Sequence, residues 1–345
     1  MLLRHTPLFS TLAFLGSFLA LTTIVSVSVG PMDISFKDSV VSIFADSNQL
    51  PTQINLVIHE IRLPRTLLCI VVGAILAICG TVTQGLFRNP LAEPGIIGVS
   101  AGASLGGALA IVSFSQYNAD YPNIINIVAV PLFAFFGAIL ATGLVYKLGT
   151  SKFGTSVTIM LLAGVAMTAL SFAGLGYINF IANDQMLRDI SLWQMGSLAG
   201  ANWTSVILCT ATLFLLVLYF TRNAMPLNAL LLGEAEASHL GISVQKLKRS
   251  LMLCTAIGVG VAVSVSGMIG FVGLVIPHLG RMLGGPDHRT LIPISACMGA
   301  LLLTFADMIS RIVLAPTELP VGIITALIGA PFFIYLLFQQ RGKIL

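Results

Sequence analysis

The stretch Arg249-Ser-Leu-Met-Leu-Cys-Thr-Ala-Ile-Gly-Val-Gly-Val-Ala-Val-Ser-Val-Ser-Gly-Met-Ile-Gly-Phe-Val-Gly-Leu-Val-Ile-Pro-His-Leu-Gly-Arg281 decides how this chain folds. Nothing between its two arginines carries a full charge at neutral pH. A helix that spans a bilayer needs roughly 20 apolar residues. The stretch is therefore either one long helix or a hairpin of two shorter ones, and the choice sets the sidedness of everything that follows.

The charges on either side favour the hairpin. Lys246 and Lys248 precede the stretch, and Arg289 follows it. Because Lys and Arg accumulate on the cytoplasmic side of membrane proteins, both ends should lie on that side. We expect the turn at the glycines of Gly267–Gly273, with a short second helix from roughly Gly270 to Leu283.

The composition extends the membrane assignment to the whole chain. Of its 345 residues, 57% are hydrophobic and only 9% are charged, and the mean hydropathy is +0.98. Soluble domains carry about 25% charged residues. A soluble enzyme, a disordered protein and a nucleic-acid-binding protein are therefore excluded. The sequence predicts an all-α polytopic protein whose solvent is the lipid bilayer.

The intervals without charged residues give the number of helices. There are nine such intervals, and counting the hairpin as two gives about ten transmembrane helices with both termini in the cytoplasm. In this arrangement twelve of the 17 Lys and Arg residues lie inside and five outside, as the positive-inside rule requires. The longest hydrophilic segments are too short for a second domain, so residues 1–345 are expected to form one transmembrane domain.

Two further patterns concern the helices themselves. The first apolar run, about Leu8 to Val29, is too long for the apolar part of a usual signal peptide and no A-x-A site follows it, so we expect a retained helix. Gly98, Gly102 and Gly106 repeat at i,i+4, which predicts a smooth helix face for close packing in lipid.

The residues give no indication that the chain powers transport itself. The nearest approach to a phosphate-binding loop, Gly149 to Ser156, has Thr155 where the phosphate-binding Lys must stand. Ionisable residues in mid-membrane mark ion-coupled carriers. Asp307 is the nearest candidate here, and its spacing predicts an i,i+4 pair with Arg311. The five Cys lack metal-ligand spacing. We therefore predict a chain that is not an enzyme and binds no cofactor or metal.

The segment Leu227 to Gly241, between the sixth and seventh helices, is too apolar for a free loop. It reads Leu-Asn-Ala-Leu-Leu-Leu-Gly-Glu-Ala-Glu-Ala-Ser-His-Leu-Gly. Two short helices broken at Gly233 and Gly241 fit this pattern. A short apolar helix on the cytoplasmic side indicates a partner groove, and a helix lying in the headgroup layer is the alternative.

Several longer motifs occur in order along the chain. They are Ile61–Arg65 (IRLPR), Gln84–Gly95 (QGLFRNPLAEPG), Leu161–Gly164 (LLAG), Gly233–Gly241 (GEAEASHLG), Gly270–His278 (GFVGLVIPH), Glu318–Gly322 (ELPVG) and Gly329–Pro331 (GAP). Together they resemble the FecCD-type permease subunits of bacterial ABC importers for iron-siderophores, haem and cobalamin. The resemblance runs from about Arg62 to Phe338. It implies the type II ABC importer permease fold and a location in the bacterial inner membrane.

The resemblance also implies partners. Such permeases form homodimers around a translocation path. Two ATPase subunits, which carry ATP and Mg, dock from the cytoplasm, and a periplasmic binding protein delivers the substrate. ATP hydrolysis would therefore belong to a separate chain.

Particular residues match the family's functional positions. The arginines that dock the binding protein match three that charge counting also places outside: Arg62, Arg65 and Arg311. The cytoplasmic gate matches Asn89 and Leu91, and more loosely Ser156 and Thr158. The ATPase-coupling positions match Leu227, Leu230, Leu231, Gly233, Glu234, Leu240 and Gly241. Leu230, Leu231 and Leu240 are expected to be buried in the ATPase, and Glu234 to pair with it or to cap the second short helix.

These motifs leave the substrate open. The stretch Ala182–Leu198 is similar to haem-importing members, which favours haem, but a ferric siderophore or cobalamin would use the same uncharged path with a basic mouth. The alternatives from other classes are an ion-coupled secondary transporter and a receptor or structural membrane protein.

Overall fold

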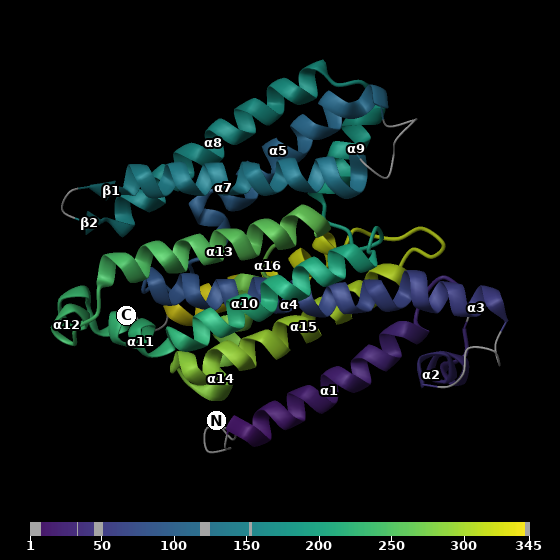
Figure 1. The fold of residues 1–345 in the computed structure, drawn as a ribbon, viewed down its shortest axis with the longest axis horizontal. Helices are drawn as coiled ribbons and strands as arrows, with labels where there is room; N and C mark the ends of the chain where they lie inside the picture. Colours follow the sequence, from purple (N-terminus) through teal and green to yellow (C-terminus); the bar gives the residue numbers. More distant parts are fainter. Residues whose placement is uncertain (1–7, 33, 45–50, 118–124, 152–153, 342–345) are drawn as a thin grey trace.

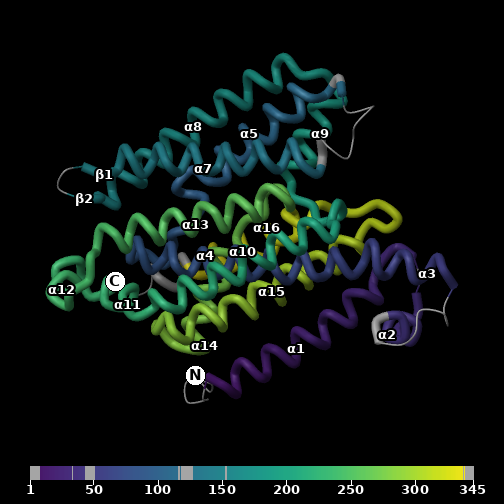
Figure 2. Tube along the Cα trace, in the orientation of Figure 1, coloured from purple at the N-terminus to yellow at the C-terminus, as the bar shows by residue number. Residues whose placement is uncertain are grey.

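The computed structural model describes residues 8–32, 34–44, 51–117, 125–151 and 154–341. Within these residues ten apolar helices form a bundle with roughly aligned axes (Figures 1 and 2). Seven are long enough to cross a bilayer: α1 (Leu8–Ser28), α4 (Leu63–Leu86), α7 (Val130–Gly149), α8 (Val157–Ile181), α10 (Trp203–Arg222), α13 (Val244–Ser266) and α15 (His288–Ile312). The other three are α5 (Val99–Phe114) and α14 (Val272–Gly284), which are shorter, and α16 (Val321–Arg341), whose apolar part is Val321–Leu336. The predicted all-α fold with ten helices is confirmed.

The remaining elements are short and lie between these helices. They are α2 (Phe36–Phe44), α3 (Thr52–Leu56), the π-helical turns η2 (Val57–Arg62) and η5 (Ile125–Ala129), the 3-10 turns η3 (Pro94–Ile97) and η4 (Ser115–Tyr117), β1 (Thr150–Ser151), β2 (Gly154–Thr155), α9 (Asp184–Gln194), α11 (Ala224–Leu232) and α12 (Glu234–His239). The helices α11 and α12 mark one end of the bundle, here the α12 end, and α2 and α3 mark the other, the α3 end (Figure 1). Helix α1 begins and α16 ends at the α12 end.

The stretch Arg249–Arg281 forms the expected hairpin. Helix α13 ends at Ser266, and Gly267 follows with φ of +67°. A Cβ at Gly267 would lie 2.2 Å from the carbonyl oxygen of Trp193, so only glycine lets the turn pass α9. Helix α14 begins at Val272, two residues later than expected. Phe271, at φ +67°, takes up the left-handed conformation at its start.

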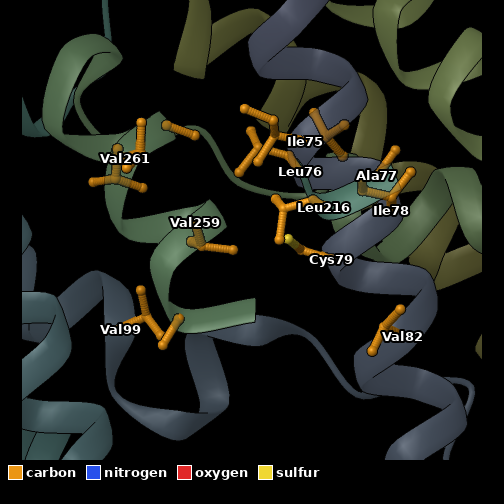
Figure 3. Close-up of a cluster of buried hydrophobic side chains, with 14 of the residues drawn as sticks. Ile75, Leu76, Ala77, Ile78, Cys79, Val82, Val99, Leu216, Val259 and Val261 are labelled. Carbon is orange, nitrogen blue, oxygen red and sulfur yellow. The ribbon is translucent and has the colours of Figure 1, made fainter. Parts of the chain in front are cut away.

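Helix α4 is the centre of the bundle. Its Ile75, Ile78 and Cys79 are fully buried, and Figure 3 shows them among side chains from α10 and α13, including Leu216 and Val259. A helix that is apolar on every side is expected inside a large bundle, and α4 packs against α10, α13, α14 and α15.

Helices α5, α7 and α8 form a second layer over α13 (Figure 1). The predicted glycine face is where α5 meets α7. A Cβ at Gly102 would lie 2.3 Å from the carbonyl oxygen of Gly137, and one at Gly106 would lie 2.2 Å from that of Phe133. The two backbones are therefore in contact, as small residues allow in membranes.

Candidate functional site

A buried ion network lies at the α3 end. The carboxylate of Asp307, on α15, is fully buried and accepts hydrogen bonds from the Nε of Arg65 at 3.0 Å and the Nε of Arg311 at 2.7 Å. Arg65 also donates to Glu318 at 2.7 Å. The predicted i,i+4 pair of Asp307 and Arg311 is confirmed. The second cation, Arg65, comes from α4, 242 residues away in sequence.

Arg311 and a third arginine, Arg62, bind the end of α1. Arg62 donates to the carbonyl oxygens of Val27 at 3.0 Å and Ser28 at 2.7 Å. Arg311 donates to that of Ser26 at 3.0 Å. The last carbonyls of a helix have no partners within the helix. The arginines therefore satisfy the C-terminus of α1 and fasten it to the bundle.

These contacts correct the expected surroundings of the predicted docking arginines. Arg62, Arg65 and Arg311 are 4%, 6% and 2% exposed, so within this chain they do not stand at a wet rim. Asp307 and the carbonyls of α1 hold the guanidinium groups inside. Their role in receiving a binding protein stays a prediction.

The first predicted gate stretch is a rigid turn at the α12 end. Helix α4 ends at Leu86, and the Asn89 side chain accepts a hydrogen bond from the Leu91 amide at 2.9 Å. Asn stabilises turns in this way, and Pro90 cannot continue a helix. Asn89 and Leu231 line the same pocket of about 230 Å³. The predicted gate and the predicted coupling segment thus adjoin.

The second gate stretch follows a small hairpin. β1 pairs antiparallel with β2, and Ser156 caps α8 by accepting from the Ile159 amide at 3.4 Å. Thr158 is exposed on the first turn of α8. Within the described ranges no hydrogen bond joins the two gate stretches of one chain.

Lys248 links this hairpin to the coupling segment. Its Nζ donates to the Thr155 carbonyl at 3.2 Å and to Glu234 at 2.5 Å. Gln245 accepts from the Thr155 amide at 3.0 Å. Glu234 was expected to pair with a partner or to cap α12. It lies in the first turn of α12 but pairs with Lys248 of its own chain.

The coupling segment has the expected form of two short helices, α11 and α12, broken at Gly233 with φ of +139°. Its apolar side chains divide into two sets. Leu227 and Leu230 are each 1% exposed and belong to the core of this chain, whereas Leu231 and Leu240 are 38% and 65% exposed. The expectation that Leu230 is free for a partner is wrong, because α11 packs against α4 and α15.

Asn228 fastens α11 to the start of α15, a contact that the sequence analysis missed. Its side chain donates to Asp287 at 2.7 Å and accepts from the His288 amide at 2.9 Å. The side chain of Arg289, then the other hydrogen-bond donors, lower the pKa of Asp287 to about 2. The sequence signal that could have indicated this contact is Asn228 itself, a single polar residue within an apolar run.

A pocket of about 730 Å³ was also missed by the sequence analysis. Loops and helix ends distant in sequence surround it, including Glu93, Met195 and Met268. Glu93 accepts a hydrogen bond from the Phe271 amide at 3.3 Å. The pocket lies beside the α13–α14 turn, and its lining is mostly apolar with few polar groups. Such a composition is typical of small-molecule sites.

The comparisons with known proteins assign this helical bundle to the transmembrane subunits of ABC importers. The profile of the FecCD transport family matches residues 18–339. The chain belongs to the FecCD transport family.

Several relatives are similar over most of their length. The hemin transport system permease protein HmuU of Yersinia pestis is 43% identical over 285 residues, which is 82% of this chain and 84% of that protein. The vitamin B12 import system permease protein BtuC of Klebsiella pneumoniae is 40% identical over 288 residues, 84% of each chain. An inward-facing structure of a metal-chelate type ABC transporter has a TM-score of 0.80 at 32% identity, covering 95% of this chain and 98% of that one.

Proposed function

We propose that this chain is the haem-conducting permease of an ABC importer, acting as a homodimer with two ATPase subunits at the α12 end and a binding protein at the α3 end. The α12 end would then face the cytoplasm. This sidedness is supported by exposed cations at that end: Arg88, Lys147, Arg222, Lys246 and Arg249. They match the bias of cytoplasmic loops.

One observation carries the choice of haem. The stretch Ala182–Leu198, which resembles haem importers, supplies Gln194 and Met195 to the wall of the 730 Å³ pocket. Haem is flat and largely apolar. Methionine side chains are flexible and polarizable, so they adapt to such a surface. Ferric siderophores and cobalamin remain the alternative substrates.

Reconstitution tests the substrate and the assembly together. The chain is placed in proteoliposomes with its ATPase, and loaded binding protein is added outside. We expect uptake of haem that requires ATP and both partners. If a ferric siderophore or cobalamin is taken up and haem is not, haem is rejected as the substrate. Uptake without the ATPase would reject the whole assignment in favour of a secondary transporter.

The coupling role belongs to the exposed Leu231 on α11 and Leu240 directly after α12. Leu231→Asp puts an unpaired charge into an apolar interface, which is costly. Because Leu231 is exposed in this chain, the variant should fold. We expect it to lose the ATPase on purification, or to keep it with hydrolysis uncoupled from uptake. Leu231→Met is the matched control. If Leu231→Asp copurifies with the ATPase and transports normally, α11 is not the coupling element.

The gate is tested by cysteine crosslinking across the proposed dimer axis. Cysteines at Asn89 or Ser156 should crosslink in one nucleotide state and not in the other. The half-buried Cys254 and Cys297 are first replaced by Ser. Crosslinking that ignores the nucleotide state would argue against a gate at these positions.

The docking role of the arginines needs a second readout. Arg62→Glu/Arg65→Glu is expected to weaken capture of the binding protein, but both side chains are buried. Thermal stability is therefore measured beside binding. Unchanged binding in the double variant would reject docking at these residues. Lost binding together with lost stability would reassign them to holding the α3 end.

A further inference from the structure

A groove between α7 and α13 takes no part in the proposed path. It has a volume of about 210 Å³, and its lining includes Thr142, Gly143 and Tyr146 from α7 and Arg249 and Leu253 from α13. Nothing lies within 4 Å of where a Cβ of Gly143 would stand. Leu253 is 53% exposed. The groove therefore opens on the side of the bundle, where lipid lies.

Polar groups follow a definite order along this groove. Arg249 and Tyr146 lie nearest the α12 end. Thr142 is one turn deeper on α7, about 6 Å along its axis, and the apolar Ile139 and Ala256 lie beyond it.

Two of these polar groups lack partners in the described part of the chain. Thr142 is only 4% exposed, and its buried hydroxyl forms no hydrogen bond. Leaving such a group unpaired costs free energy. Arg249 is exposed and forms no ion pair there. Neither α7 nor α13 contains an acidic residue.

We propose that this groove binds one anionic phospholipid. The phosphate lies on Arg249, an ester carbonyl accepts the Thr142 hydroxyl proton, and an acyl chain runs past Ile139 and Ala256. The order of basic, hydroxyl and apolar groups matches the order of phosphate, ester and hydrocarbon in the lipid.

Charge and size support this ligand. Basic pockets between transmembrane helices bind anionic headgroups, and the exposed Lys147 and Lys246 near the mouth add to the positive potential. The volume corresponds to about seven groups the size of a water molecule. The groove thus holds the glycerol region and the start of one chain, while the rest of the lipid stays in the bilayer.

Native mass spectrometry of the full chain tests this proposal. The protein is equilibrated with mixed micelles of phosphatidylglycerol and phosphatidylcholine, and retained lipid is counted. Gly143→Leu fills the groove and should abolish selective retention of phosphatidylglycerol. Arg249→Gln should reduce it about fivefold.

Matched controls exist for both variants. Gly176, on α8, is exposed and also has open space at its Cβ position, and Arg222 is an exposed cation at the same end of the bundle. Gly176→Leu and Arg222→Gln should retain phosphatidylglycerol as the unchanged protein does.

Four results would overturn the proposal. The first is that Gly143→Leu and Arg249→Gln retain as much phosphatidylglycerol as the controls, and the second is that the protein retains phosphatidylcholine equally well. The third is that millimolar inorganic phosphate displaces the lipid. The fourth is that Gly143→Leu loses the dimer rather than the lipid. Displacement by phosphate would indicate a simple anion site. Loss of the dimer would indicate that a helix of a second copy occupies the groove.

Discussion

Asp307→Asn is the sharpest test of the ion network at the α3 end. The substitution keeps the shape of the side chain but removes the charge that faces Arg65 and Arg311. Arg65 would retain Glu318 at 2.7 Å, whereas Arg311 would retain only uncharged partners at the end of α1. Removing one partner of a buried ion pair costs about 3–5 kcal/mol. Since only Arg311 loses its last charged partner, we expect a loss of about 4 kcal/mol in the free energy of unfolding.

The assay is loss of helical circular dichroism as SDS is added to the protein in mixed micelles. Glu318→Gln is the graded control, because Glu318 is 27% exposed and binds one arginine; it should cost about 1 kcal/mol or less. Asp184→Asn, at an exposed site on α9, controls for the change of residue type. The reasoning is refuted if Asp307→Asn unfolds at the same SDS fraction as Asp184→Asn, or if Glu318→Gln costs as much as Asp307→Asn.

Three further predictions concern other parts of the chain. Gly137→Ala should destabilise the protein by about 1–3 kcal/mol, because its Cβ would lie 2.2 Å from a backbone oxygen of α5, whereas Gly143→Ala on the same helix should be neutral or stabilising in the same SDS titration. The lowered pKa of Asp287 stabilises the fold above about pH 4, and this contribution is lost as pH falls toward 2; thermal stability between pH 4.5 and 2.5 should fall more steeply in the unchanged protein than in Asp287→Asn. Lys248→Met removes the link from α12 to the β1–β2 hairpin and, if the proposed assembly holds, should reduce uptake up to about tenfold while ATP hydrolysis by the partner continues.

The hairpin of α13 and α14 was predictable because its signal is local. Charges near Arg249 and Arg281 determine the hairpin without reference to the rest of the chain. The Asp307–Arg311 pair was predictable for the same reason, since i,i+4 neighbours on a helix must meet. Arg65 was not predictable as their partner, because nothing local brings residues 242 positions apart together.

Which side of α11 is buried could not be predicted from the sequence, for a different reason. The helix is apolar on nearly all sides, so periodicity defines no inner face. Leu230 and Leu231 are adjacent and identical in chemistry, yet one is buried and the other exposed. Only the positions of α4 and α15 separate them. The 730 Å³ pocket could not be predicted either, because loops distant in sequence surround it.

The cross-bundle pair of Arg65 and Asp307 also imposes an order in time. Translation proceeds at about 5–20 residues per second, so Arg65 is made about 12–48 s before Asp307. Until then Arg65 has no acid from α15, and the C-terminal carbonyls of α1 lack Arg311. A nascent chain that stops before residue 307 therefore cannot close the α3 end, however well its earlier helices have inserted. Completion of this end reports that nearly the whole polypeptide has been synthesised.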